Sequence, residues 1–314
     1  IGVSQLHRNA AFGWLSSFNL ACMTLIWPYI VLVLLGCGWG LTIPLTVIAV
    51  KTGLGHLGII FWQFFIVMVL FGLRQIFLKN QLSLARSSLQ IFCVIAFIGT
   101  IFPNSASLIA ASYLPGGVLS ILIATVPMFA FPIALFLGID KFEFSRVFGI
   151  IFGFLGVYLL IAPEAALPDP SVIWIIPIAL IAPIFYGLEG NFVAKFGTGN
   201  SSPIEVLLGA SIIGCFVTFP LAILSNQFVN PFVPWTASHY ALVLSSIIHG
   251  IVYATYVWLV TRVGVVFSAQ VSYFVTLAGV LWSMIILDEV HSKFIWMSLI
   301  CMILGMTLVK PRSH

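Results

Sequence analysis

The chain has 314 residues, of which 61% are hydrophobic and only 6% are charged, and its 12 basic and 8 acidic side chains give a net charge of +4. An ordinary soluble domain carries about 25% charged residues, so this composition excludes a soluble enzyme and a soluble nucleic-acid-binding protein. With a mean hydropathy of +1.20, the chain is predicted to be an all-α integral membrane protein.

Residues 1–28 precede the first uninterrupted apolar run. Apolar residues recur at near-helical spacing from Phe12 to Leu25, but polar residues around Asn19 interrupt them. Because a proline inside a helix removes a backbone hydrogen bond, Pro28 is expected to break the pattern. We therefore expect a separate amphipathic helix at the membrane interface rather than an eleventh span.

Ten apolar runs follow, separated by short turns and charged residues. Each is long enough for a helix of about 20 residues that crosses the hydrocarbon core. The runs are 29–50, 55–78, 88–112, 116–138, 144–162, 171–196, 204–226, 237–261, 265–287 and 293–310.

The linkers are short, and the longest, near 163–170, divides the chain into two halves, 29–163 and 170–311. If the N-terminus is cytoplasmic, the basic residues gather on the cytoplasmic side, and only Lys51 and Lys293 lie on the other side. Since basic residues favour the cytoplasmic side, this bias predicts ten spans with both termini in the cytoplasm.

The two halves resemble each other at a nearly constant offset. Residues 39–41 match 186–188, each an aromatic residue followed by Gly-Leu, and Asp140 matches Asp288. Each half holds five predicted helices, an odd number, so the second half must be inverted relative to the first. Inverted repeats that share a site near the membrane midplane are typical of secondary transporters.

Several motifs resemble those of the drug/metabolite transporter superfamily, specifically its EamA-type ten-helix members. They are Gly38-Trp39-Gly40, Arg146-x-x-Gly149, Gly156 to Leu160, and the stretch from Thr261 through Asp288-Glu289 to Gly305. The resemblance implies a transporter of the bacterial inner membrane, often an exporter of amino acids or related metabolites.

Glu189 is the one formal charge well inside a span. It precedes Lys195 by six residues, which places it ~9 Å deeper than the end of its helix. An acid at such depth costs roughly 2.5–3.5 kcal/mol, so it should be protonated, paired or facing a watery cavity. We interpret it as a cation or proton site. The alternative is a carboxylate satisfied by a neighbouring helix or by water from the cytoplasmic side.

Other polar and aromatic side chains also lie within the spans, which suggests a cavity wall. Packing or contact with lipid is the favoured alternative for most of the individual rings, except for Trp39 and Tyr186, which are equivalent in the two repeats and near the midplane. Aromatic rings near one acid suit a cationic amine through cation–π contact. Two alternatives stay open for His249, a proton relay or a neutral imidazole that joins helices, and Gln270 contacts either substrate or another helix. The predicted substrate-binding residues are Trp39, Tyr186, Glu189, His249, Tyr253, Gln270 and Tyr273.

These observations predict a secondary transporter that exports an amino acid, an amine or a similar small metabolite by alternating access, with protons as the candidate coupling ion. The alternatives are a membrane-embedded enzyme and a non-transporting membrane scaffold. The sequence carries no Gly-x-Ser-x-Gly, His-Glu-x-x-His or phosphate-loop motif, and it predicts no enzyme, cofactor or metal. The expected partners are the substrate and the lipid bilayer, without nucleic acid, and both a monomer and a homodimer are compatible with the sequence.

Overall fold

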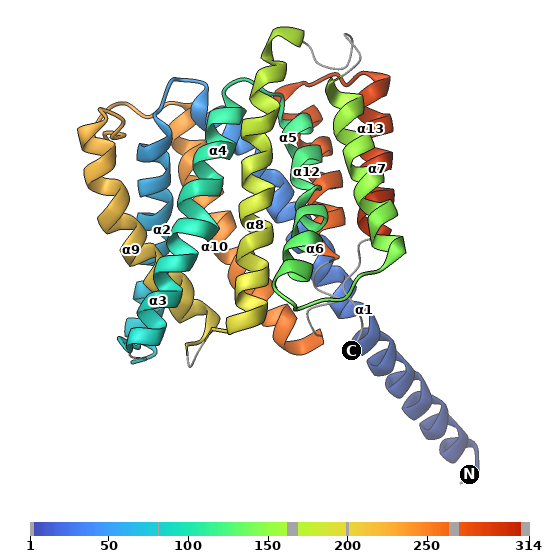
Figure 1. The fold of residues 1–314 in the computed structure, drawn as a ribbon. Coiled ribbons are helices and arrows are strands. Elements are labelled where there is room, and N and C mark those ends of the chain that lie inside the picture. Colours follow the sequence, from blue (N-terminus) through green and yellow to red (C-terminus); the bar gives the residue numbers. More distant parts are fainter. Residues whose placement is uncertain (1–2, 81, 162–168, 199–200, 264–269, 309–314) are drawn as a thin grey trace.

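The computed structural model describes the chain except for residues 1–2, 81, 162–168, 199–200, 264–269 and 309–314. All regular elements in the described residues are helices (Figure 1). They are α1 (Val3–Val50), α2 (His56–Phe77), α3 (Arg86–Val94), the π-helix η1 (Ile95–Ile101), α4 (Phe102–Ala111), α5 (Gly116–Ile123), α6 (Val126–Phe136), α7 (Phe144–Ile161), the 3₁₀-helix η2 (Pro170–Ile175), α8 (Ile176–Phe196), α9 (Pro203–Leu224), α10 (Ala237–Val263), α12 (Val271–Leu287) and α13 (Lys293–Leu308).

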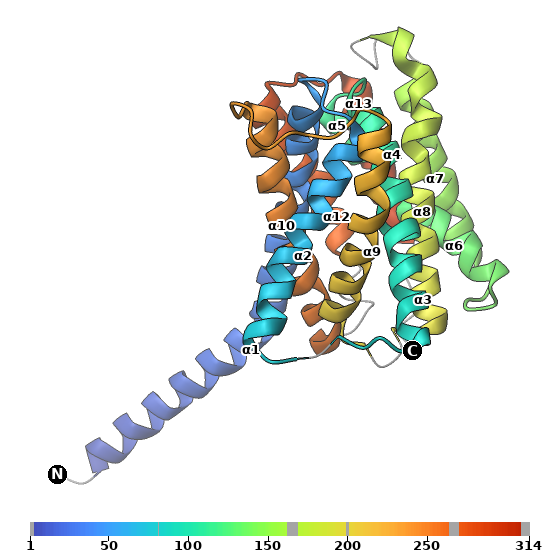
Figure 2. The same cartoon turned by 90° about the vertical axis from the view of Figure 1, so that its left-hand side faces the viewer.

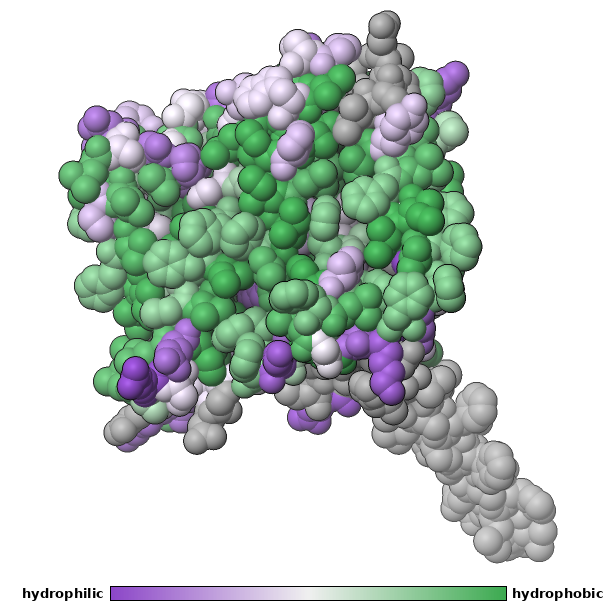
Figure 3. Space-filling model, viewed as in Figure 1, coloured by the Kyte–Doolittle hydropathy of each residue, from purple (hydrophilic) through white to green (hydrophobic). Residues whose placement is uncertain are grey.

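On the face shown in Figure 3, a broad apolar belt lies between two polar ends. Among the described residues, seven helical segments are long and apolar enough to cross a membrane, and three shorter apolar helices run beside them. A surface of this kind is stable only when lipid covers it. The predicted all-helical, multi-pass membrane fold is therefore confirmed, whereas the number of ten crossings stays a prediction.

Helix α1 differs from the sequence expectation. It runs through Pro28 without a break, and its first part extends away from the bundle in both views (Figures 1 and 2). The predicted break at Pro28 is wrong, because proline already has a helical φ and the bond that it removes is tolerated in membrane helices. That residues 3–25 lie at the membrane interface stays a prediction.

The pairing of the helices reflects the inverted repeat. Helix α1 of the first repeat packs mainly on α10 and α12 of the second repeat. Its counterpart α8, in the second repeat, packs mainly on α4 and α6 of the first. The pairs α2 with α9 and α7 with α13 join counterparts directly. Exchanging the two halves therefore reproduces the same set of contacts, and the largest contact surfaces lie between the halves.

The crossing of α1 with α12 depends on a glycine. A Cβ atom on Gly40 would lie 2.8 Å from both the Ala278 Cβ and the backbone nitrogen of Gly279, closer than van der Waals contact allows. Small residues at such crossings let helix backbones approach closely, which is a main source of packing energy in lipid. Gly72 in α2 is different, since a Cβ there would meet only Leu208, at 3.8 Å.

Replacing Gly40 by alanine should therefore push α1 from α12 and lower the free energy of unfolding by about 1–3 kcal/mol, the usual cost of overpacking. Thermal unfolding of the purified protein in one detergent measures the effect. The control, Gly72→Ala, should be neutral or slightly stabilising because alanine favours helix more than glycine does. Equal melting temperatures for the two variants would contradict the packing described.

Candidate functional site

A cavity of about 910 Å³ lies between the two repeats. Side chains from both halves line it, including all seven residues that the sequence predicted for a substrate site: Trp39, Tyr186, Glu189, His249, Tyr253, Gln270 and Tyr273. The fold thus brings together side chains from α1, α8, α10 and α12. Gln270 and Tyr273 belong to the first turn of α12, where the Tyr273 N–H bonds to the Gln270 carbonyl at 3.1 Å.

The cavity extends toward one end of the bundle. Its lining includes Asp140 and Arg146 at the start of α7, Ala194 near the end of α8 and Met306 near the end of α13. We call this the open end; the first part of α1 projects from it (Figure 1). Among the described residues, the lining includes none from the loops 51–55, 112–115, 225–236 and 288–292 at the opposite end, which we call the closed end.

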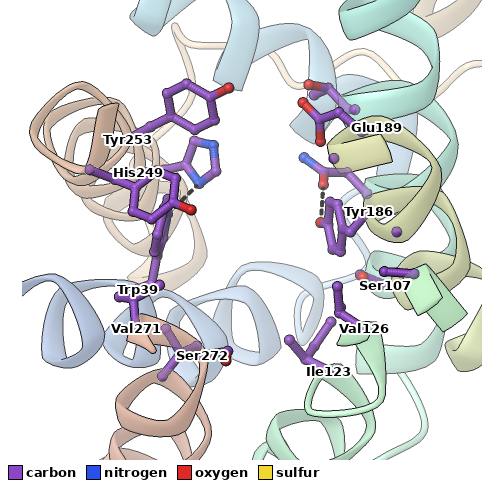
Figure 4. Close-up of a pocket in the computed structure, with 18 of the residues that line it drawn as sticks. Trp39, Ser107, Ile123, Val126, Tyr186, Glu189, His249, Tyr253, Val271 and Ser272 are labelled. Atoms are coloured by element: carbon purple, nitrogen blue, oxygen red, sulfur yellow. Dashed lines mark hydrogen bonds between the residues drawn. The ribbon is translucent and has the colours of Figure 1, made fainter. Parts of the chain in front are cut away.

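One wall of the cavity is formed by α8 with α4, η1 and α2. The Tyr186 hydroxyl donates a hydrogen bond to Asn104 Oδ1 at 2.9 Å, and Asn104 Nδ2 donates to Gln63 Oε1 at 3.2 Å. This chain of side-chain bonds joins three helices from the two repeats and fixes the tyrosine ring beside Glu189 (Figure 4). The polar residues Asn104 and Gln63 therefore bond helices together at the wall of the cavity.

The carboxylate of Glu189 lies against the backbone of η1. A Cβ atom on Gly99 would come within 2.5 Å of Glu189 Oε1, so the carboxylate in its present position uses the space that glycine leaves. Glu189 forms no hydrogen bond or ion pair with another described residue. Its oxygens are available to a ligand in the cavity, and η1 is a π-helix, a distortion that is frequent at functional sites.

The opposite wall is formed by α1 and α10 (Figure 4). Trp39 Nε1 donates a hydrogen bond to His249 Nδ1 at 3.3 Å, and the Trp39 ring lies 6.3 Å from Tyr253 and 5.3 Å from Tyr256. An indole N–H can only donate, so Nδ1 must accept, and the proton of the neutral imidazole is on Nε2. This wall thus offers a hydrogen-bond donor among aromatic rings, facing the wall that carries Glu189.

Sequence reasoning missed one cluster of the lining. The Arg146 side chain is only 3% exposed; its Nε lies 3.2 Å from Glu143 Oε2, and it also forms an ion pair with Asp140. Its guanidinium lies 5.0 Å from the centre of the Phe131 ring. Acidic residues three and six positions before an arginine were a signal for this cluster, but counting charges by membrane side hid it.

Family comparison agrees with this geometry. The model of the EamA-like transporter family matches residues 26–162 and again residues 173–310. The chain belongs to the EamA-like transporter family. The two matches coincide with the two halves that exchange contacts in the fold, which confirms that this EamA-family protein is built from two repeats.

The similarity to a solved structure supports the fold and gives no information on function. A protein of known crystal structure aligns with this EamA-family chain with a TM-score of 0.56 and 15% identity, over 88% of this chain and 96% of the other. No curated protein matches the chain in sequence. The substrate must therefore be argued from the side chains of the cavity.

Replacing Arg146 by methionine should lower the free energy of unfolding by about 1–3 kcal/mol, because it removes the cation that Asp140 and Glu143 share at the open end. Unfolding in detergent measures it, with Arg74→Met as the control, since Arg74 is exposed at the end of α2. A loss of stability that is the same in both variants would refute the structural role of Arg146.

Proposed function

We propose that this protein is a secondary active transporter that exports a small amine-bearing metabolite, such as an amino acid or amine, by alternating access. The site is the cavity between the repeats, and protons are the coupling ion. The family resemblance supports a bacterial inner membrane as its location, and the bias in basic residues supports both termini in the cytoplasm. The observation that carries the proposal is Glu189, an acid without a partner among the described residues, on the wall of a cavity between inverted repeats.

Coupling to protons follows from the chemistry of an acid at this depth. A carboxylate surrounded by protein and lipid needs a proton or a cation to be stable there. A proton and a substrate ammonium would satisfy Glu189 in turn, and each would exclude the other. Alternate occupancy of one acid is sufficient to exchange a proton for an amine without a second ionic site.

The opposite wall supports an amine with a polar second group. The rings of Trp39 and Tyr253 offer π faces to a cation, and His249 offers its Nε2–H to a carboxylate or carbonyl. A cavity of about 910 Å³ lies within the usual range of sites for small organic ligands. An amino acid would use both walls, whereas a simple amine would use Glu189 and the rings.

The position of the open end of the cavity supports export as the direction of transport. With the termini in the cytoplasm, the open end faces the cytoplasm, and the described state is ready to load substrate from inside the cell. Exchange of the two repeats' conformations would close this end and open the other, as in other inverted-repeat transporters.

The test is counterflow in liposomes that contain the protein, with a panel of radiolabelled amino acids and amines at two pH values. Glu189→Gln should reduce exchange about tenfold or more and abolish its pH dependence, because glutamine neither binds a proton nor balances an ammonium. The control, Glu205→Gln, makes the same change in the capping box of α9, where glutamine serves equally well, and should behave like the wild type.

Unchanged transport and unchanged pH dependence in Glu189→Gln would remove Glu189 from the mechanism. If the wild-type protein exchanges none of the panel, the proposal of an amine exporter fails, and a membrane-embedded enzyme or a non-transporting scaffold becomes the better interpretation.

A further inference from the structure

At the closed end of the cavity, one carboxylate links the two repeats. Glu289, in the loop between α12 and α13, accepts a hydrogen bond from the Gly116 N–H at 2.6 Å and another from the Gly117 N–H at 2.9 Å. Both amides belong to the first turn of α5. Since α5 lies in the first repeat and Glu289 in the second, these bonds tie the two repeats together above the cavity.

The chemistry of this contact favours a charged acceptor. The first N–H groups of a helix have no partner within the helix, and the helix dipole makes this end attractive to an anion. The residue before α5, Pro115, supplies no side-chain cap. Glu289 therefore caps α5 from the other repeat, with two charge-assisted hydrogen bonds.

The closed contact also holds polar atoms that lack partners. In the described part of the chain, the buried side-chain atoms without a hydrogen bond are Ser283 Oγ and His291 Nε2. These are the atoms that a Cβ on Gly116 and on Gly117, respectively, would strike first. Burial lowers the pKa of His291, although Glu289, 3.7 Å away, acts in the opposite direction. Closing this end therefore costs desolvation energy, which the bonds of Glu289 offset.

The repeat-related loop at the open end is in a different state. Asp140 is the counterpart of Asp288, and it is held together with Glu143 by Arg146 of its own repeat, where Asp140 and Arg146 line the cavity mouth. At the closed end the counterpart Asp288 forms no bond to α5; the next residue, Glu289, which stands where the first repeat has Lys141, bonds to a helix of the other repeat. The two ends thus differ in the way that an alternating mechanism requires.

We propose that Glu289 is the latch of the closed end: its bonds to Gly116 and Gly117 hold this end shut in the present state, and they break when the cavity opens there. The balance between these bonds and the unsatisfied Ser283 and His291 makes the contact easy to release. The role goes beyond the proposed function, because it concerns the gate and not the substrate.

The test uses a reporter cysteine beneath the latch. Ser283→Cys, made after replacing the five native cysteines, places a thiol against Gly116 where the wild-type side chain is buried. The protein is reconstituted in one orientation, and a membrane-impermeant methanethiosulfonate reagent is added on the closed side. Adding Glu289→Gln should speed modification about tenfold or more, since at least one charge-assisted bond is lost.

The matched control is Asp288→Asn. It makes the same change in charge one residue away, and asparagine tolerates the left-handed backbone of this position (φ 53°). Asp288 forms no bond to α5. In the Asp288→Asn variant, the thiol at position 283 should therefore be modified at the same rate as in the protein that carries Ser283→Cys alone. Modification from the open side should stay unchanged in both, which separates gate opening from unfolding.

A second variant leaves the charge in place. Gly117→Ala would press a methyl group against the His291 ring and prop the contact open, so it should also speed modification from the closed side. Rates for Glu289→Gln and Gly117→Ala equal to that of Asp288→Asn would overturn the latch. The assay contains no substrate, so its failure would leave the proposed amine transport untouched, and failure of counterflow would leave the latch standing.

Discussion

The structure depends on the cost of placing one ionisable group inside a hydrocarbon layer. Glu189 lies within a span, and lipid cannot supply the water, proton or counter-ion that a carboxylate needs. The fold meets this requirement by leaving a cavity between the repeats and turning the acid toward it. Polar and aromatic side chains of both repeats complete the wall of that cavity.

The repeat architecture gives the cavity two unequal ends. Counterpart helices make counterpart contacts, yet the end near Glu289 is closed by bonds between the repeats, and the end near Arg146 is open. An internal two-fold relation with unequal ends is compatible with the proposed alternating access. Between the two ends, the hydrogen-bond chain through Asn104 joins α8, α4 and α2 across the repeats.

Much of this followed from the sequence because hydrophobic run length and charge bias are local properties. Run length predicted the helices, and the odd number of runs in each half predicted the inversion of the second half. Polar and aromatic residues inside the runs predicted seven side chains that the fold brings to one cavity, and their role in substrate binding stays a prediction. The continuity of α1 through Pro28 was missed, because proline ends a helix only where its lost bond is not compensated.

Contacts between the repeats could not be predicted in the same way. The bond of Trp39 to His249 and that of Glu289 to Gly116 join residues far apart in the chain, and spacing along one helix carries no information about them. Spacing along a helix likewise does not show that Glu189 and His249 lie on opposite walls of the cavity (Figure 4).

The central claim is that the cavity beside Glu189 is the transport path. The most direct measurement places a cysteine at Gly190, which lines the cavity and has no atom within 4 Å of where its Cβ would be, in a chain without native cysteines. The account predicts that an impermeant thiol reagent reacts there from the open end, that a transported amine slows the reaction, and that modification stops counterflow. A thiol that stays unreactive from that end, or that reacts without affecting counterflow, would contradict the account.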